Sequence, residues 1–306
     1  MKFDLVLTNP PFQDSVNRNK TPHKLWIDFT LHSFGQLVAE GGLLCQVSPT
    51  SFSSPNSKIL TLMKNYQLEV LRLDSGRHFK DYENAPGSTF SDYSIRRVAN
   101  SGKGTLVVTP DETFHMVLDK NIWYLPNDLN HISLAIHKKV IIDPPEKLHV
   151  RWDYVTNHNI RRHSNKVDEV TLSETKSDTF KYAVLHTNNK IWWSSRNADY
   201  APLPKVMWSR SGYMKPFADK SGLAVTDMGY YVVTESDDES MVLAENLSSS
   251  LIRYVCKTAK WSGFGNERVF ASLPKLPVDK VLTDEEVFDL FKLSEEEREY
   301  VREFMA

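Results

Sequence analysis

Cysteine is scarce in this sequence: only Cys45 and Cys256 occur among 306 residues, far apart and in apolar stretches. Two such residues form neither a disulfide framework nor a cysteine metal site, so we expect both to be small core residues. The ten histidines form no His-Glu-x-x-His motif and no cluster with cysteine, so we expect no catalytic metal. No apolar run approaches the roughly 18 residues of a membrane-spanning helix, and Asp4 interrupts any signal-peptide pattern. We therefore expect no membrane segment and a cytoplasmic protein.

Charge is distributed unevenly along the chain. The net charge is only −2, but residues 283–306 carry nine Asp or Glu against three Lys or Arg. The remainder is therefore mildly basic. Such a body fits a protein that binds nucleic acid, although runs of charge are most often solvated faces.

The first 110 residues alternate between strand and helix patterns. We predict a strand at 3–8, a helix at 22–39 ended by Gly41 and Gly42, a strand at 43–49, a helix at 55–66 and a strand at 68–74. This order is typical of a parallel α/β sheet. The strand patterns at 88–98 and 104–110 leave no room for a helix between them, so we expect an antiparallel hairpin to close the sheet.

The rest of the chain has a different residue pattern. Short β-rich runs over 143–234 predict a separate, loop-rich β domain. A long helix should follow, because Ser236 and Glu239 form a capping box ahead of a stripe of Leu243, Leu247, Leu251 and Val255. Two further helices have boxes of their own, Thr283 with Glu286 and Ser294 with Glu297. We predict domains at 1–110 and 111–282, and an acidic helical tail at 283–306.

The most specific motif is Asn9-Pro10-Pro11-Phe12, which directly follows the first predicted strand. Loops at the carboxyl ends of such strands are where α/β sheets bind ligands. The side-chain oxygen of Asn9 and the carbonyl of Pro10 are two acceptors that suit an exocyclic amine, whose lone pair must be localised before it can attack. The prolines stiffen the loop, and Phe12 offers a face for an extruded base.

A four-residue match of this kind is often only a proline-rich turn, and the chain contains a natural control. Asp143-Pro144-Pro145 also follows an apolar run, but Glu146 stands where the aromatic residue must be. We interpret that second segment as an ordinary turn.

The Asn-Pro-Pro-Phe motif resembles the central loop of the amino-methyltransferases of DNA, particularly the N6-adenine enzymes. Three longer segments are also similar to these enzymes, particularly to those of type II restriction-modification systems. They are KLWIDFTLHSFGQLVAEGGLLCQVSPTSF, LRLDSGRHFKDYENAPGSTFSDYSIRRV and AKWSGFGNERVFASLPKLP. The resemblance implies a partial Rossmann-like sheet, a target-recognition domain over 111–282 and a prokaryotic or phage origin. It implies S-adenosylmethionine as methyl donor, Trp26 and Phe29 as cofactor-binding residues, and Phe79, Tyr82 and Phe90 as supports of a flipped adenine.

The glycine-rich turn that holds the donor in such enzymes is missing. Only eight residues precede the Asn-Pro-Pro-Phe motif. A permuted order would place the turn near the C-terminus, where the sole Gly-x-Gly, Gly263-Phe264-Gly265, follows a helical pattern. Three explanations stay open: a second polypeptide supplies the donor-binding segment, the sequence begins at an internal methionine of a longer enzyme, or the protein is a relative that only binds DNA. A half-built sheet with open edges favours one of the first two.

Two stretches with a positive balance are candidate contacts to double-stranded DNA. Residues 151–166 and 205–220 each hold four Lys or Arg against one Asp. The first candidates for base or phosphate contacts are the fork-like side chains Arg161, Arg162 and Arg210, joined by Trp208, Tyr213 and Lys215. We assign Trp192 and Trp193 to the core of the β domain.

These observations favour a site-specific DNA adenine N6-methyltransferase that flips its target base. A non-catalytic DNA-binding protein that has kept the fold is the alternative, because the donor turn is missing. A third possibility is that the Asn-Pro-Pro loop acts on another amine, in RNA or in a protein amide.

Overall fold

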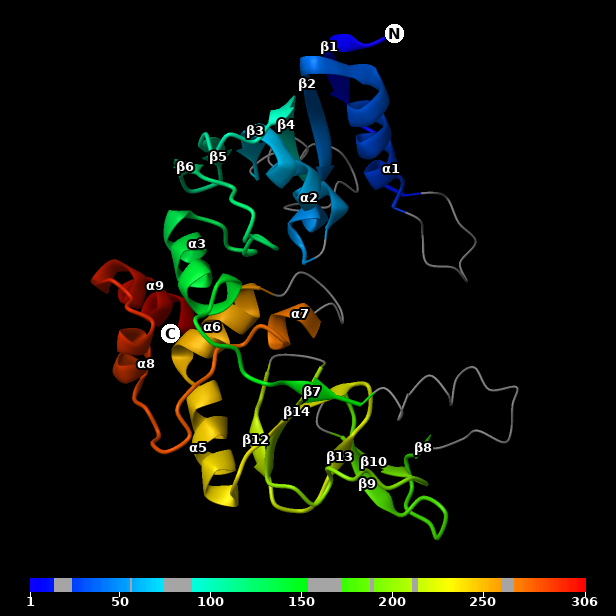
Figure 1. The fold of residues 1–306 in the computed structure, drawn as a ribbon, viewed down its shortest axis with the longest axis vertical. Coiled ribbons are helices and arrows are strands. Elements are labelled where there is room, and N and C mark those ends of the chain that lie inside the picture. Colours follow the sequence, from blue (N-terminus) through cyan, green and yellow to red (C-terminus); the bar gives the residue numbers. More distant parts are fainter. Residues whose placement is uncertain are drawn as a thin grey trace. The chain divides into compact units, whose positions relative to one another are not determined.

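The computed structural model describes residues 1–13, 24–55, 57–73, 90–153, 172–187, 190–210, 214–259 and 267–306. They belong to two compact units, Met1–Ala135 and Ile136–Ala306 (Figure 1). The division thus falls later than the domain limit predicted after residue 110, and residues 283–306 are part of the second unit. No helix in these ranges is long and apolar enough to traverse a lipid bilayer.

The first unit is built on a six-stranded sheet with the order β1-β2-β4-β3-β5-β6. Strands β1, β2, β3 and β5 run parallel, whereas β4 and β6 run antiparallel to their neighbours. The carboxyl ends of the four parallel strands therefore meet at one edge, together with the start of β4. The strands are Phe3–Thr8, Val38–Pro49, Tyr66–Arg72, Phe90–Ala99, Thr105–Val108 and Thr113–Met116 in chain order.

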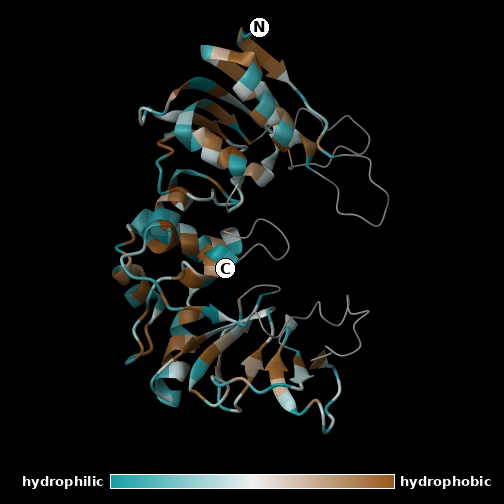
Figure 2. Cartoon of the chain, turned by 45° about the vertical axis from the view of Figure 1, so that its right-hand side comes forward, coloured by the Kyte–Doolittle hydropathy of each residue, from teal (hydrophilic) through white to brown (hydrophobic). Residues whose placement is uncertain are grey.

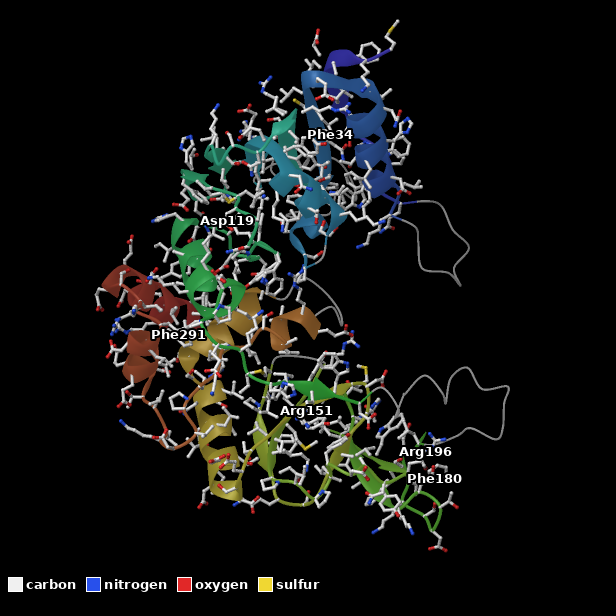
Figure 3. All side chains as sticks on the ribbon, in the orientation of Figure 1. Phe34, Asp119, Arg151, Phe180, Arg196 and Phe291 are labelled. Carbon is white, nitrogen blue, oxygen red and sulfur yellow. The ribbon has the colours of Figure 1, made fainter. Side chains whose placement is uncertain are left out.

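One face of this sheet carries the core of the unit. Helices α1 (Leu25–His32) and α2 (Lys58–Asn65) bury Trp26, Thr30, Ile59, Leu60 and Met63. Ser57 caps α2 by accepting a hydrogen bond from the backbone N–H of Leu60. Phe34, labelled in Figure 3, is 3% exposed and meets Tyr66 edge to face. Buried residues alternate with half-buried ones along β2 and β4, and the buried ones form the apolar surface of this face.

The opposite face and the β1 edge stay open in the described residues. Within the sheet β1 pairs only with β2, and its Phe3, Leu5 and Leu7 are 46%, 52% and 71% exposed. Figure 2 shows hydrophobic residues along the strand at the N-terminal edge. Parallel strands are normally covered on both faces and continued or protected at the edge. β1 therefore has the apolar residues of an interior strand, although it lies at the edge of the described sheet.

Two sequence predictions for this unit need correction. Helix α1 gives way to a single π-helical turn, Ser33–Leu37, and β2 already starts at Val38, so Gly41 and Gly42 lie inside a strand. Gly41 has a φ of +77° where the register between β1 and β2 shifts. The expected hairpin of 88–98 with 104–110 is also wrong, because β4 inserts between β2 and β3, and β5 forms the closing hairpin with β6 instead.

The second unit contains two four-stranded sheets of short strands, as the texture of 143–234 predicts. Their orders are β13-β9-β10-β8 and β12-β11-β14-β7. Trp192 on β10 is half-buried and packs against the small core around Leu172 and Val184, in line with its assignment. The strands from β7 to β14 are Arg151–Trp152, Leu172–Ser173, Tyr182–Leu185, Ile191–Ser194, Lys205–Ser209, Phe217–Asp219, Ala224–Val225 and Gly229–Val233.

The long helix predicted from Ser236 onward is two helices, α5 and α6. The stripe of Leu243, Leu247, Leu251 and Val255 is fully buried as expected, but the helical backbone stops at Ser248 and restarts at Ser250. Serine side chains compete for backbone hydrogen bonds, which weakens a helix interior. Asp284 then accepts hydrogen bonds from the backbone N–H and the hydroxyl of Ser250.

The helices that follow confirm their sequence signals. Both predicted boxes of the C-terminal region are formed, Thr283 with Glu286 and Ser294 with Glu297. Each box satisfies two backbone N–H groups that a helix start leaves unpaired. The described helices after the first sheet are α3 (His131–His137, followed by a π turn at Lys138–Ile142), α5 (Asp237–Leu247), α6 (Ser250–Thr258), α7 (Glu267–Phe270), α8 (Asp284–Leu290) and α9 (Glu295–Met305).

A buried ion pair joins β11 to β12. Lys205 and Asp219 are directly opposite across the strands, and Lys205 Nζ lies 2.7 Å from Asp219 Oδ2 with both side chains at most 1% exposed. Lys205 also donates to the carbonyl groups of Ala201 and Leu203. Burial alone raises the pKa of Asp219, but hydrogen bonds from Lys205 and Ser221 outweigh it and leave the pKa below its ordinary value.

We predict that Lys205→Met lowers the free energy of unfolding by about 3–5 kcal/mol, because it leaves a buried carboxylate without its cation. Urea denaturation at neutral pH measures the loss. Because the folded pKa of Asp219 lies below the unfolded one, the carboxylate's contribution in the wild type is complete at neutral pH and disappears as the pH falls through the folded pKa.

Two controls accompany this variant. The double variant Lys205→Met with Asp219→Leu removes both charges and should recover much of the loss. Lys220→Met changes an exposed lysine beside the same strand and should stay within about 0.5 kcal/mol of the wild type. A single Lys205→Met variant as stable as the wild type would contradict the role of the pair.

Candidate active site

The motif Asn9-Pro10-Pro11-Phe12 directly follows β1 at the carboxyl edge of the sheet. Asn9 and Pro11 are exposed, Pro10 is buried and Phe12 is half-buried. The ring of Phe12 meets that of Phe90 at the start of β4, with 5.2 Å between centroids and a 40° tilt. The buried proline fixes the loop to the sheet while the asparagine stays accessible.

A hollow of about 680 Å³ begins at Asn9 and continues over the open face of the sheet. Residues that point to this face alternate with the buried ones, and four strands contribute to it. The lining comprises Leu7, Thr8, Asn9, Cys45, Gln46, Val47, Val70, Arg72, Asp92, Tyr93 and Ser94. This volume lies within the range of small-molecule sites.

The same hollow holds two charged residues and a thiol. Arg72 and Asp92 are opposite each other on β3 and β4, and both line the hollow. Burial raises the pKa of Cys45, and the charge of Asp92 raises it further. The thiol therefore stays protonated at neutral pH and is a poor nucleophile. The chemistry offered here is hydrogen-bond acceptance and charge, not covalent attack.

A polar network on the covered face holds the strands beside the motif. Gln46 on β2 donates through Nε2 to Thr30 Oγ1 at 2.5 Å and to the Tyr93 hydroxyl at 3.1 Å. Thr30 in turn donates to the carbonyl of Trp26 at 2.7 Å. Burial raises the pKa of Tyr93 to about 12, so the phenol stays neutral. The network joins α1, β2 and β4 just behind the hollow.

The sequence did not single out Gln46 or Tyr93. The available signal was a glutamine inside the apolar run at 43–49, at a position that faces the core by strand alternation. A buried polar residue in such a run predicts a hydrogen-bond partner, but its partners lie 16 and 47 residues away in the chain.

The residues expected to hold the methyl donor do not form a cradle. Trp26 is 2% exposed and belongs to the core under the sheet, whereas Phe29 on the same helix is 44% exposed. One helix thus presents the two rings to different surroundings. Together with the missing glycine-rich turn, this means that the described residues do not fit S-adenosylmethionine.

The predicted DNA contacts of the second unit have mixed outcomes. Trp208 is fully buried and packs against Tyr230 and Phe270, so it is a core residue and not a surface contact. Arg210 forms an ion pair with Glu267 at 2.5 Å. Lys215 is exposed. The predicted residues Phe79, Tyr82, Arg161, Arg162 and Tyr213 lie outside the described residues.

The control segment Asp143-Pro144-Pro145 has a different context from the motif after β1. It follows a π-helical turn, Lys138–Ile142, whose apolar residues are buried. The apolar run before it is therefore the end of a helix and not a strand. The interpretation of this segment as an ordinary turn agrees with that placement.

No protein-family model matches the chain, and no curated protein matches it significantly. The solved structures to which the chain is similar include three restriction-modification enzymes. The Type IIL restriction-modification enzyme MmeI in complex with DNA has 10% identity and a TM-score of 0.39, over 80% of this chain and 42% of that one. The Type ISP enzyme LlaGI, a nuclease-deletion mutant with a DNA substrate mimic, has 9% identity and a TM-score of 0.44, over 89% and 40%.

The ATP-dependent Type ISP restriction-modification enzyme LlaBIII bound to DNA has 8% identity and a TM-score of 0.41, over 94% of this chain and 29% of that one. This chain thus spans less than half the length of each of the three. All three TM-scores are below 0.5.

We predict that Tyr93→Phe lowers the free energy of unfolding by about 1 kcal/mol, because Gln46 Nε2 loses a buried acceptor. Urea denaturation monitored by circular dichroism measures the change. Tyr66→Phe is the matched control, since the described structure gives that half-buried tyrosine a ring contact but no hydroxyl hydrogen bond. Equal losses in the two variants would show that the hydroxyl network contributes nothing.

Proposed function

We propose that this chain is the catalytic and recognition part of a site-specific DNA adenine N6-methyltransferase, with a methyltransferase-type Rossmann-like sheet. One observation carries the proposal: Asn9-Pro10-Pro11-Phe12 follows a parallel strand and borders an open hollow with a paired aromatic ring. The substrate would be double-stranded DNA from which the target adenine is extruded, since a base inside the duplex is out of reach.

The residues of the motif would act on the adenine amine. Asn9 is exposed beside the hollow, so its side-chain oxygen is available to accept one N–H bond of the amine. The Pro10 carbonyl would accept the second N–H bond, which localises the nitrogen lone pair for attack. Phe12 and Phe90 together provide an aromatic surface on which the base stacks.

The methyl donor would be S-adenosylmethionine, held mainly by residues outside this sequence, either on a second polypeptide or in a preceding segment of a longer enzyme. The described residues of this chain do not fit the donor, whereas the β1 edge and the open face beside Asn9 are unfinished. A partner that adds a strand parallel to β1 and covers Leu5 and Leu7 would close the hollow over Asn9. Strand pairing at the edge and burial of apolar surface would both stabilise this association.

The alternative function is DNA binding without catalysis, which the missing glycine-rich turn favours. Calorimetric titration of S-adenosylmethionine into the chain, alone and with a co-encoded partner, separates the two functions. Heat of binding with the partner supports the methyltransferase, and no heat in either case supports the binding protein.

We predict that Asn9→Ala reduces methyl transfer to DNA by roughly 100-fold or more, because the amine loses a preorganised acceptor in the transition state. Incorporation of tritiated methyl groups into duplex DNA by the chain with its donor-binding partner is the measurement. Asn9→Asp keeps an acceptor oxygen and should retain more activity. Asp143→Ala alters the control segment and should leave incorporation unchanged; unchanged incorporation in Asn9→Ala would refute the assignment.

We predict that Leu5→Asp and Leu7→Asp abolish association with the donor-binding polypeptide, because each places a charge on a surface that must be buried. Both side chains are more than half exposed in this chain, so thermal unfolding of the chain alone should change little. Size-exclusion chromatography of the mixture measures association. Val98→Asp, at a 40% exposed position of β4, is the control. Unimpaired association of both β1 variants would place the interface elsewhere.

A further inference from the structure

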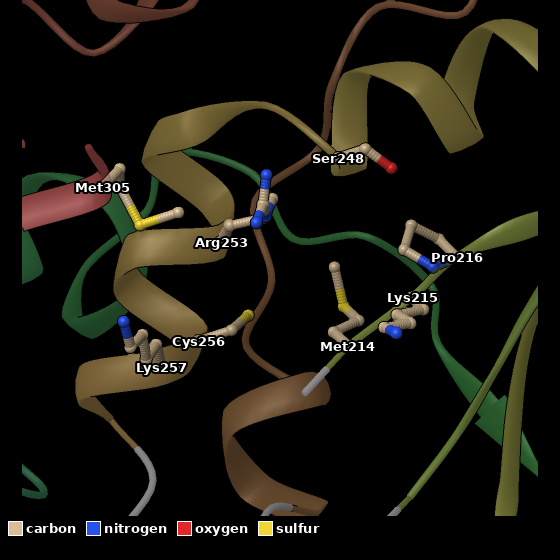
Figure 4. A pocket seen from close by; sticks show the side chains of 8 residues that line it. All are labelled: Met214, Lys215, Pro216, Ser248, Arg253, Cys256, Lys257 and Met305. Carbon is tan, nitrogen blue, oxygen red and sulfur yellow. The ribbon is translucent and has the colours of Figure 1, made fainter. Parts of the chain in front are cut away.

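The second unit contains a cavity of about 470 Å³ that is separate from the hollow beside Asn9. Helix α6 forms one wall, and the segment that leads into β12 forms the other (Figure 4). Met305 near the end of α9 also lines it. The volume lies within the range of small-molecule sites, which are concave rather than flat.

Three cations surround this cavity. Lys215 comes from the segment before β12, and Arg253 and Lys257 come from adjacent turns of α6. All three residues are exposed, and none of the residues that line the cavity is acidic. The ammonium of Lys257 lies over the ring of Phe304, 4.8 Å from its centroid. The cavity lining therefore offers an anion the charges of Lys215 and Arg253.

The interior of the cavity is lined by sulfur. Met214 is 6% exposed, Cys256 is 9% exposed, and Met305 completes the group. Figure 4 shows Cys256 on α6 and Met214 on the opposite wall. Burial raises the pKa of Cys256 to about 12, so its thiol stays neutral. Thioether and thiol groups are polarizable and make favourable contacts with aromatic rings.

We propose that this cavity binds a nucleoside phosphate, with the base against the sulfur-lined interior and the phosphate between Lys215 and Arg253. The guanidinium of Arg253 suits bidentate contact with a phosphate, and Lys215 adds a point charge. The ligand is either a free mononucleotide or one nucleotide of a single strand, since both present the same base and phosphate. This site does not depend on the Asn9 motif or on methyl transfer.

The proposal is tested by calorimetric titration of the full chain with adenosine 5′-monophosphate, adenosine, inorganic phosphate and a short single-stranded oligonucleotide. We expect one mononucleotide per chain, bound at least tenfold more tightly than adenosine or phosphate alone. Binding of the oligonucleotide without the mononucleotide would identify a strand as the source. If nothing binds, or if phosphate alone binds as well as the nucleotide, the proposal is wrong.

Variants connect the binding to this cavity. Arg253→Glu and Lys215→Glu should each weaken nucleotide binding at least tenfold, whereas Lys220→Glu, an exposed lysine that does not line the cavity, should leave it unchanged. Arg253→Gln is a milder variant that removes the fork without reversing the charge. Circular dichroism melting verifies folding. Wild-type affinity in both Arg253 variants would overturn the proposal.

Discussion

The parallel pairing of β1 with β2 is the constraint on which the candidate site depends. The register from Leu5 opposite Leu43 to Thr8 opposite Gln46 directs the chain out at the carboxyl edge, so Asn9 borders the hollow and Phe12 reaches Phe90. The Pro144-Pro145 dipeptide after Asp143 follows a helical turn instead of a strand. The chemistry that the motif can support therefore depends on its position after a parallel strand and not on its residue types alone.

Local signals in the sequence were enough to predict the parallel strands, the caps of α8 and α9 and the apolar stripe through Leu243 and Val255. Such features depend on residues a few positions apart. The insertion of β4 between β2 and β3 was not predictable in this way, since it is decided by pairings across the whole sheet. The break at Ser248 was visible as a run of serines, but the buried stripe continues across it and hides the interruption.

For the site, the sequence could predict the loop but not its surroundings. Asn9 and Phe12 are adjacent in the chain, so their chemistry could be read directly. The support from Gln46, Thr30 and Tyr93 joins three elements and has no short-range signature. Trp208 shows the opposite error: an aromatic residue among cations suggested a DNA contact, whereas alternation and packing against Phe270 place it in the core. Composition says which residues are available, and tertiary packing decides which of them reach solvent.

The buried pair of Lys205 and Asp219 has a further consequence for the second unit. A shift of one residue between β11 and β12 would turn one charge toward the opposite face and separate it from the other, so alternative alignments of these strands are strongly disfavoured. The connection between the two strands can therefore change in length and composition during evolution without misaligning the sheet. Such an arrangement allows surface variation to be selected independently of folding.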